Sequence, residues 1–258
     1  MKSKPWLIGE SNWKEVREYR YEIAVLPWGA TEPHNTHLPY TTDNYQVAHI
    51  AGESARIAWE KGIRVAVLPV VPYGVQTGMA GLPFAINMNP STQAAVLKDI
   101  VVSLEQQGIE KMLILNGHGG NCFRQMIREL QPERKMFLCQ MNWYTLSRPG
   151  HFFDEPGDHA GEMETSLMMH LYPDLVRPLS EAGDGAARSF RIKALKEGRA
   201  WAPRVWTQVT NDTGVGNPAR AHPEKGKRYL DALCAEIAGF LEELADAEPG
   251  NLYETGDG

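Results

Sequence analysis

Residues 23–43 read IAVLPWGATEPHNTHLPYTTD and join an apolar run to a cluster of acidic and imidazole side chains. The run, residues 23–27, is short, continuous and apolar, which is typical of a strand buried inside a sheet. The loop after it carries one Glu, two His and one Asp between residues 32 and 43. Such groups are costly to bury unless they are paired or coordinated. The stretch therefore predicts a buried strand that ends in either a solvated loop or a site.

The rest of the chain repeats this alternation of apolar runs and helical segments. Alternation of this kind is typical of a sheet with crossover helices. The strands are almost continuous in Val, Ile and Leu, which predicts a sheet covered on both faces. We expect an α/β fold with residues 1–258 in a single domain. The expected strands are residues 23–27, 64–71, 112–115 and 136–141, and the expected helices are residues 44–61, 91–107, 122–130, 161–172 and 223–247.

Composition narrows the class of protein. Of the 258 residues, 22% are charged and 43% are hydrophobic, which is the balance of an ordinary soluble protein. No apolar stretch is long enough to cross a bilayer, and the opening residues lack the apolar region of a secretory signal. The net charge of −6 argues against a general nucleic-acid surface. Three scattered cysteines suggest neither a disulfide framework nor a cysteine-based zinc site, so we predict a cytoplasmic protein.

Three polar clusters follow expected strands. The first lies in residues 28–43, the second is NGHGGN at residues 116–121, and the third is DHAGEMETS at residues 158–166. In an open α/β sheet, ligands bind beyond the carboxyl ends of the strands. Coordinating residues placed by chance would scatter over both edges. The clusters therefore predict one site at one edge of the sheet.

In the first cluster, Glu32 and His34 are two residues apart. In extended chain such residues project to the same side, and Pro33 stiffens the link, so both groups can reach one metal ion. Asp43 stands at the start of an expected helix, where it is either a third ligand or an N-cap. His37 is interpreted as a hydrogen-bonded support of the site or as loop packing.

In the second cluster, glycines flank His118. The motif is not the dinucleotide fingerprint G-x-G-x-x-G. A histidine among glycines has few side chains to pack against, so coordination of a metal is favoured over a place in the core.

In the third cluster, helical periodicity places Glu164 on the apolar, inward face of the expected helix, where a cation would compensate its charge. Glu162 falls on a more polar stripe and is interpreted as a support of the site or a surface residue. His159 precedes this helix. It is a candidate proton shuttle, with packing at the helix start as the alternative.

Carboxylates and imidazoles without thiolates fit zinc, manganese or iron. Five such groups exceed the needs of one tetrahedral zinc ion, so we predict two ions, a bound hydroxide nucleophile and hydrolysis. Two other classes stay open: a non-hydrolytic isomerase or lyase with one ion, and a non-catalytic module that binds an anion at the glycine loop. Trp143 and Tyr144 follow the fourth strand and either stack on a planar substrate or pack in the core or an interface.

The segments GATEPHNTHLPYTTD, NGHGGN and HAGEMETS, in this order, resemble the three signatures of the creatininase (creatinine amidohydrolase) family. The resemblance covers roughly residues 25–174. It implies a three-layer αβα fold with a mostly parallel sheet, a binuclear metal centre and often a hexamer. It also implies cleavage of non-peptide C–N bonds in cyclic or formyl amides, so the expected partner is a small amide substrate.

The same resemblance assigns roles to residues of this chain. It implies that Glu32 and His118 hold one metal ion, that His34 holds the other and that Asp43 bridges them. His159 matches the catalytic histidine of the family.

Two features depart from the family pattern. Gly120 stands where creatininases carry a metal-binding Glu, and Glu164 is the candidate replacement. The segment MAGLPFAINM, residues 79–88, lacks the family's His and Phe-Pro-Gly-Thr pattern. Other branches that resemble this family deformylate a pyrimidine nucleotide precursor or trim a peptide, and these substrate classes are alternatives to creatinine.

A basic segment, residues 188–204, stands out in an otherwise acidic chain. It is interpreted as a solvated or subunit-facing surface, with contact to an anionic, for example phosphorylated, substrate as the alternative. Its basic residues are Arg188, Arg191, Lys193, Lys196, Arg199 and Arg204, with Glu197 as the acidic one.

Overall fold

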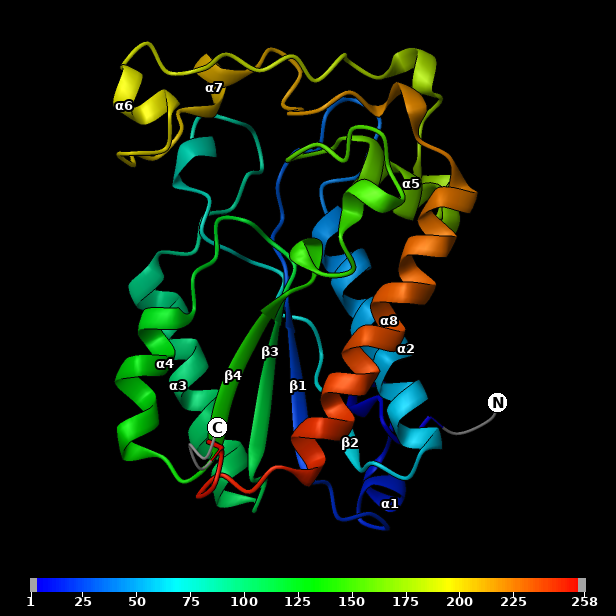
Figure 1. The fold of residues 1–258 in the computed structure, drawn as a ribbon, viewed down its shortest axis with the longest axis vertical. Coiled ribbons are helices and arrows are strands. Elements are labelled where there is room, and N and C mark those ends of the chain that lie inside the picture. The colour runs from blue at the N-terminus through cyan, green and yellow to red at the C-terminus, as the bar shows by residue number, and fades with distance from the viewer. Residues whose placement is uncertain (1–3, 255–258) are drawn as a thin grey trace.

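The computed structural model describes residues 4–254 and has a four-stranded parallel sheet in the order β2-β1-β3-β4 (Figure 1). The predicted parallel arrangement is confirmed. One prediction was too long: β2 ends at Val67 instead of continuing to Val71. Leu68 N–H still donates to Val25 O, but the next hydrogen bond to β1 runs from Val71 N–H to Pro27 O, so three residues of this segment match two of β1 and the regular pairing ends. The strands are β1 (Ile23–Trp28), β2 (Val65–Val67), β3 (Lys111–Asn116) and β4 (Phe137–Asn142).

Five longer helices lie within one or two residues of their predicted bounds. They are α2 (Thr42–Glu60), α3 (Pro90–Gln106), α4 (Arg124–Leu130), α5 (Glu162–Leu171) and α8 (Pro223–Asp246). Three short α-helices lie elsewhere within residues 4–254: α1 (Trp13–Val16), α6 (Lys193–Lys196) and α7 (Trp206–Val209).

Helices cover both faces of the sheet, as Figure 1 shows, with α2 and α8 on one side and α3 and α4 on the other. Alternate residues of a strand project to opposite faces. Accordingly, Ile23 and Val25 pack in one apolar cluster with α2 and α8, whereas Ala24 and Leu26 pack in a second cluster with α3 and α4. This arrangement confirms the predicted three-layer αβα fold.

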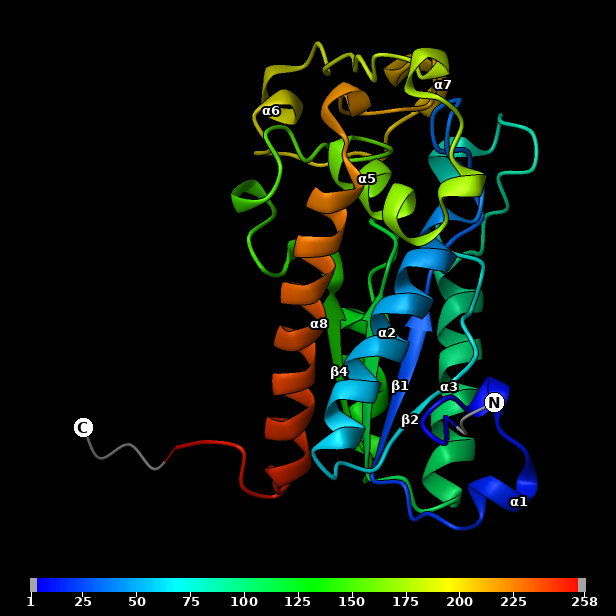
Figure 2. The same ribbon diagram turned by 90° about the vertical axis from the view of Figure 1, so that its right-hand side faces the viewer.

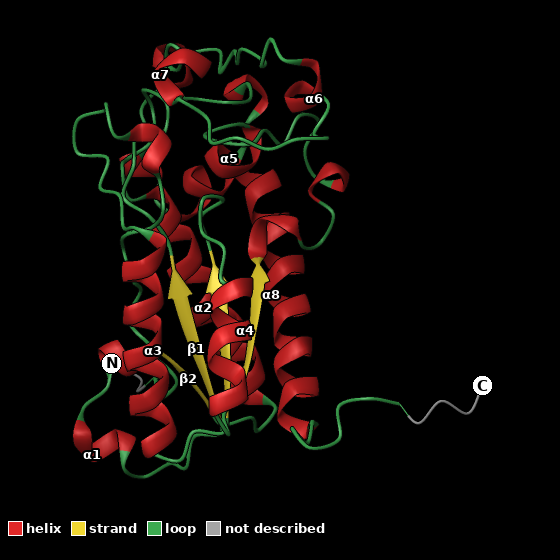
Figure 3. Cartoon of the chain, turned by 90° about the vertical axis from the view of Figure 1, so that its left-hand side faces the viewer, coloured by secondary structure: helices red, strands yellow, loops and turns green. Residues whose placement is uncertain are grey.

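The carboxyl ends of the strands all face one end of the molecule. Figures 2 and 3 show the strand arrows pointing toward a region of loops and short helices that contains α5, α6 and α7. The polar clusters that follow β1, β3 and β4 are therefore brought to a common edge. Within residues 4–254, none of the helices combines the length and apolar character needed to cross a membrane.

Candidate metal centre

The loop after β1 and the first turn of α2 supply three buried polar side chains. Glu32, His34 and Asp43 are each at most 2% exposed. His34 Nε2 lies 3.0 Å from Asp43 Oδ1. The residue that caps α2 is Thr41, and Asp43 lies within the first turn with its carboxylate toward the imidazoles. The alternative that Asp43 is an N-cap is therefore wrong.

Three imidazole rings around this cluster are oriented by the backbone. His34, His118 and His159 each place one ring nitrogen against a carbonyl oxygen, which can only accept a hydrogen bond. That nitrogen must carry the proton, so in the neutral ring the other nitrogen keeps its lone pair. Metal-binding histidines are usually held in this way. The pairs are His34 Nδ1 with Glu32 O at 3.0 Å, His118 Nε2 with Val75 O at 3.0 Å, and His159 Nε2 with Pro33 O at 2.8 Å.

The remaining ring nitrogens face the carboxylates. His118 Nδ1 lies 2.9 Å from Glu32 Oε1 and 3.1 Å from Asp43 Oδ2, and His159 Nδ1 lies 3.7 Å from Glu32 Oε1. The imidazole rings of His34 and His159 also stack, with centroids 4.1 Å apart. Imidazole nitrogens and carboxylate oxygens, all potential metal ligands, thus converge on one small volume.

The pKa values show how strongly this cluster attracts positive charge. Burial alone would lower the pKa of His34, but Asp43, aided by nearby carboxylates, raises it to about 10. Burial is likewise outweighed at His118, whose pKa is raised well above its usual value by Glu32 and Asp43. Burial raises the pKa of Glu164 to about 7 despite the opposing effect of His34. Protons compensate the buried carboxylates here, and bound cations could do the same.

The donor atoms fit divalent metal ions. Two triplets of potential ligand atoms, each with all members within 4.8 Å of one another, share one residue: Glu32–Asp43–His118 and His34–Asp43–Glu164. A third triplet is formed by Glu32, His34 and His159. Glu32 Oε2 is buried without a hydrogen-bond partner, an arrangement that costs free energy unless a cation fills the need. Mixed nitrogen and oxygen donors suit zinc, manganese and iron.

An amide network behind His118 was missed by the sequence analysis. Asn121 Oδ1 accepts hydrogen bonds from the backbone N–H of Val75 and from Gln93 Nε2, at 3.0 and 2.9 Å. Asn121 Nδ2 donates to Asn116 Oδ1, which also accepts from the backbone N–H of His118. The network therefore fixes the Val75 carbonyl that orients the ring of His118. Both asparagines lie in NGHGGN, but nothing in the sequence marks Val75 or Gln93.

Gly120 has no room for a side chain. A Cβ at this position would meet the Val75 carbonyl oxygen far inside contact distance and would lie 2.5 Å from His118 Nε2. The glutamate that the family pattern has here could not be accommodated without moving this loop. Glu164, which belongs to α5, instead lies close to His34 and Asp43.

We expect Gly120→Ala to destabilise the fold by about 1–3 kcal/mol, because the new methyl group must displace the backbone of Val75. Chemical denaturation monitored by circular dichroism measures this free energy. Gly119→Ala is the matched control, since a Cβ there meets no atom within 4 Å. Equal stabilities of the two variants would contradict the prediction.

Other predicted residues surround the cluster at different depths. Glu162 is fully buried but belongs to no ligand triplet, so the surface interpretation is wrong. It accepts hydrogen bonds from Lys225 Nζ at 2.5 Å and from the backbone N–H of Glu155 at 2.8 Å, and it thereby ties the start of α5 to α8. His37 is buried, with Nε2 2.8 Å from Thr165 Oγ1 of α5.

The two candidate stacking residues separate. Trp143 is fully buried in the apolar core, so of the two alternatives for this residue, stacking on substrate or packing in the core, the structure supports core packing. Tyr144 lines a cavity of about 110 Å³ at the centre. The ionisable groups that also line it are Glu32, Asp43, His118, Asp158, His159 and Glu164.

Comparison with known proteins identifies the family. The family described as creatininase, creatinine amidohydrolase, matches residues 9–241. The chain belongs to the creatininase family. The family places it among amidohydrolase-like hydrolases.

Relatives with different named activities match most of this chain. The chain is 28% identical to the mycofactocin precursor peptide peptidase of Mycolicibacterium smegmatis, over 83% of each chain. It is 27% identical to the creatinine amidohydrolase of Pseudomonas putida, over 93% of this chain and 98% of the relative. It is 24% identical to the 3-dehydro-scyllo-inosose hydrolase of Thermotoga maritima, over 92% and 82%.

Solved structures agree with this assignment. A Bacteroides fragilis protein provisionally named a creatinine amidohydrolase is 46% identical, with a TM-score of 0.92 over 98% of this chain and all of that one. Creatininase structures named for a zinc pair and for manganese are 24% and 22% identical, with TM-scores of 0.74 and 0.70. They cover 95% and 94% of this chain and 100% and 99% of their own, and they show the shared fold.

Proposed function

We propose that this creatininase-family chain hydrolyses a non-peptide C–N bond of a small amide, either a cyclic amide or a formamide, with two divalent metal ions. The observation that carries the proposal is the pair of ligand triplets that share Asp43. A shared carboxylate is what a bridged pair of ions needs, whereas a one-ion isomerase or lyase needs a single triplet.

The triplets suggest how the ions are divided. Glu32 and His118 would hold one ion, His34 and Glu164 the other, and Asp43 would bridge them. Zinc and manganese, the metals named for the creatininase structures, suit this donor set. When bound, such ions polarise the substrate carbonyl and make a water molecule nucleophilic near neutral pH.

His159 is suited to move the proton that hydrolysis requires. Its Nε2–H is committed to the Pro33 carbonyl, so Nδ1 is the nitrogen that can take up a proton and deliver it to the leaving nitrogen. His159 also lines the cavity together with Glu32 and Asp43. A proton taken up at Nδ1 therefore has only a short path to a substrate held there.

The relatives set the range of substrates to test. A peptidase, a creatinine amidohydrolase and an inosose hydrolase are similar to this chain in sequence, and each named activity is a hydrolysis. The cavity of about 110 Å³ admits a small reactive group. This size supports cyclic amides and formamides, with the end of a short peptide as the second candidate because the peptidase relative matches across most of its length.

Elemental analysis of the purified protein tests the proposal. We expect about two equivalents of zinc or manganese per chain, loss of activity on dialysis against a chelator, and recovery when either metal is added back. Activity is screened on cyclic amides, formamides and short peptides. One ion per chain would favour the isomerase or lyase, and indifference to chelator with no bound metal would favour the anion-binding module.

A further inference from the structure

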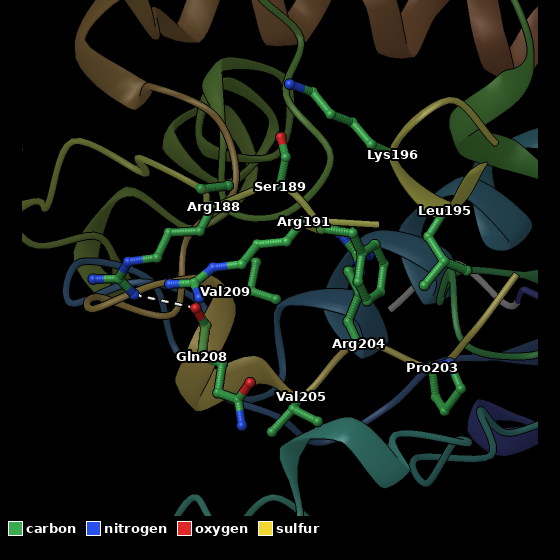
Figure 4. A pocket seen from close by; sticks show the side chains of 12 residues that line it. Arg188, Ser189, Arg191, Leu195, Lys196, Pro203, Arg204, Val205, Gln208 and Val209 are labelled. Atoms are coloured by element: carbon green, nitrogen blue, oxygen red, sulfur yellow. Dashed lines mark hydrogen bonds between the residues drawn. The ribbon is translucent and has the colours of Figure 1, made fainter. Parts of the chain in front are cut away.

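A second and larger cavity lies in the segment that contains α6 and α7. It encloses about 840 Å³ and is lined by residues between 187 and 209 (Figure 4). Pockets of about 300–1,000 Å³ are typical of small-molecule sites. No acidic side chain is among its lining residues, whereas four basic ones are: Arg188, Arg191, Lys196 and Arg204.

The positive charge of this basic cavity is largely uncompensated. Glu197, the acidic residue of segment 188–204, pairs with Lys193 and Arg199, neither of which lines the cavity. Among residues 4–254, Arg191 and Lys196 have no side-chain hydrogen bond or ion pair. In a chain with a net charge of −6, such a concentration of exposed, unpaired cations creates a local positive potential that attracts an anionic partner.

Arg188 is held in place by neutral acceptors. Its guanidinium donates to the Gln208 carbonyl oxygen at 3.2 Å and to Asn211 Oδ1 at 2.7 Å. Figure 4 shows the side chains of Arg188 and Arg191 extending toward Gln208. The charge of Arg188 is thus oriented without being neutralised, which is how arginine is prepared for a carboxylate or phosphate.

Arg204 connects the basic cavity to the metal centre. Its Nη1 lies 2.5 Å from Asp158 Oδ2, and Asp158 lines the 110 Å³ cavity. The Arg204 guanidinium also lies 4.5 Å from the ring centroid of Trp206, and the rings of Trp206 and His159 are perpendicular, with centroids 5.3 Å apart. The pair Arg204–Asp158 therefore marks the boundary between the two cavities.

This boundary can open at small cost. The side chains of Arg204 and Asp158 are 41% and 57% exposed, and ion pairs so exposed contribute only about 0–1 kcal/mol. A substrate anion can therefore replace the Asp158 carboxylate as the partner of Arg204. The small cavity accommodates the reactive amide, so the remainder of a larger substrate has to extend beyond it.

We propose that the basic cavity binds an anionic arm, a carboxylate or a phosphate, of the substrate whose amide group lies at the metal centre. This inference rests on the proposed function, because it names the class of substrate for the same site. Arg188 and Arg191 hold the anion, and Arg204 lies between it and the metal centre.

Binding of simple anions tests the cavity without any turnover. Inorganic phosphate and glutarate are titrated into the metal-loaded protein by calorimetry at constant ionic strength. We expect Arg191→Gln to weaken binding of at least one of them about tenfold. Lys193→Gln is the matched control, since it removes the same charge from the same segment but from a side chain outside the cavity. Equal binding by wild type and both variants overturns the inference.

Turnover of a matched series then tests the link to the metal centre. N-formylethanolamine, its O-phosphate and N-formyl-β-alanine share one scaffold and end in a hydroxyl, a phosphate and a carboxylate. We expect kcat/KM to be about tenfold or more higher for one of the anionic compounds, and Arg191→Gln to remove that preference while the neutral compound is unaffected. The preferred anion distinguishes phosphate from carboxylate.

The outcomes separate this inference from the proposed function. Turnover without preference, and with no effect of Arg191→Gln, overturns the anionic arm and leaves the hydrolase standing. Absence of turnover together with Arg191-dependent anion binding overturns the hydrolase proposal and retains the anion site. Light scattering of Arg191→Glu tests a third outcome. If this variant changes the size of the oligomer but not anion binding, the cavity belongs to an interface with a second copy of the chain, and the inference is overturned.

Discussion

Replacing Asp43 with asparagine is expected to lower kcat/KM by at least about 10³-fold and to remove most of the bound metal. Asp43 belongs to both of the triplets assigned to the ions, Glu32–Asp43–His118 and His34–Asp43–Glu164, so in the proposed two-ion centre its loss would affect both ions at once. A neutral amide keeps the shape of the side chain but cannot supply the negative charge that two adjacent cations share. Metal content by elemental analysis and steady-state kinetics on the best substrate of the screen measure the two effects.

Glu164→Gln is the comparison variant, because Glu164 belongs to a single triplet. It is expected to retain about one ion per chain, whereas Asp43→Asn retains few or none. Circular dichroism of both variants verifies that they fold. If Asp43→Asn kept two ions and wild-type activity, the assignment of Asp43 as the bridge would be wrong.

The central strands of the sheet could be predicted because β1 and β3 are buried on both faces. All six residues of β1, Ile23–Trp28, and all six of β3, Lys111–Asn116, are buried, so their sequences are nearly continuous in apolar residues. The common edge of the polar clusters then followed from parallel topology alone. The early end of β2 could not be predicted, because it depends on a one-residue shift of register against β1 between Leu68 and Val71, and the apolar residues there do not reveal this shift.

The surroundings of the site could not be predicted in the same way, because they depend on partners far along the chain. Helical periodicity placed Glu162 on a polar stripe, but Lys225, 63 residues later, provides the ammonium that allows this carboxylate to be buried. The backbone carbonyl groups of Pro33 and Val75 orient the imidazoles of His159 and His118. Any amino acid at position 33 or 75 would have the same carbonyl group. Such backbone contacts leave no signal in residue types.

The basic segment shows a third reason for incomplete prediction. Its charges were evident from the sequence, but their pairing was not. Glu197 compensates Lys193 and Arg199, and within residues 4–254 this leaves Arg188, Arg191 and Lys196, which line the basic cavity, without an acidic partner. Whether a charge run is a solvated surface or a binding site is therefore decided by tertiary contacts, which composition does not contain.

Replacing His159 with glutamine is expected to lower kcat by about 10²–10⁴-fold while both ions stay bound. A glutamine amide can still donate to the Pro33 carbonyl, as His159 Nε2 does at 2.8 Å, but it has no basic nitrogen in place of Nδ1. Burial and the nearby imidazole of His34 lower the pKa of His159, so its ring is neutral near pH 7 and Nδ1 is free to take up a proton. Pre-steady-state and steady-state kinetics with parallel metal analysis measure the result.

The metal analysis decides between two roles that the geometry allows His159. As a proton carrier, His159 can be lost without loss of an ion, whereas as a member of the Glu32–His34–His159 triplet its removal would lower the metal content together with kcat. His37→Gln is the control for loss of a buried imidazole: His37 contacts Thr165 of α5 and lies outside the cavity, so kcat is expected to stay near the wild-type value. An unchanged kcat in His159→Gln would exclude the proton-carrying role. His118 is the other imidazole that lines the cavity, and the proposed ligand set already requires it.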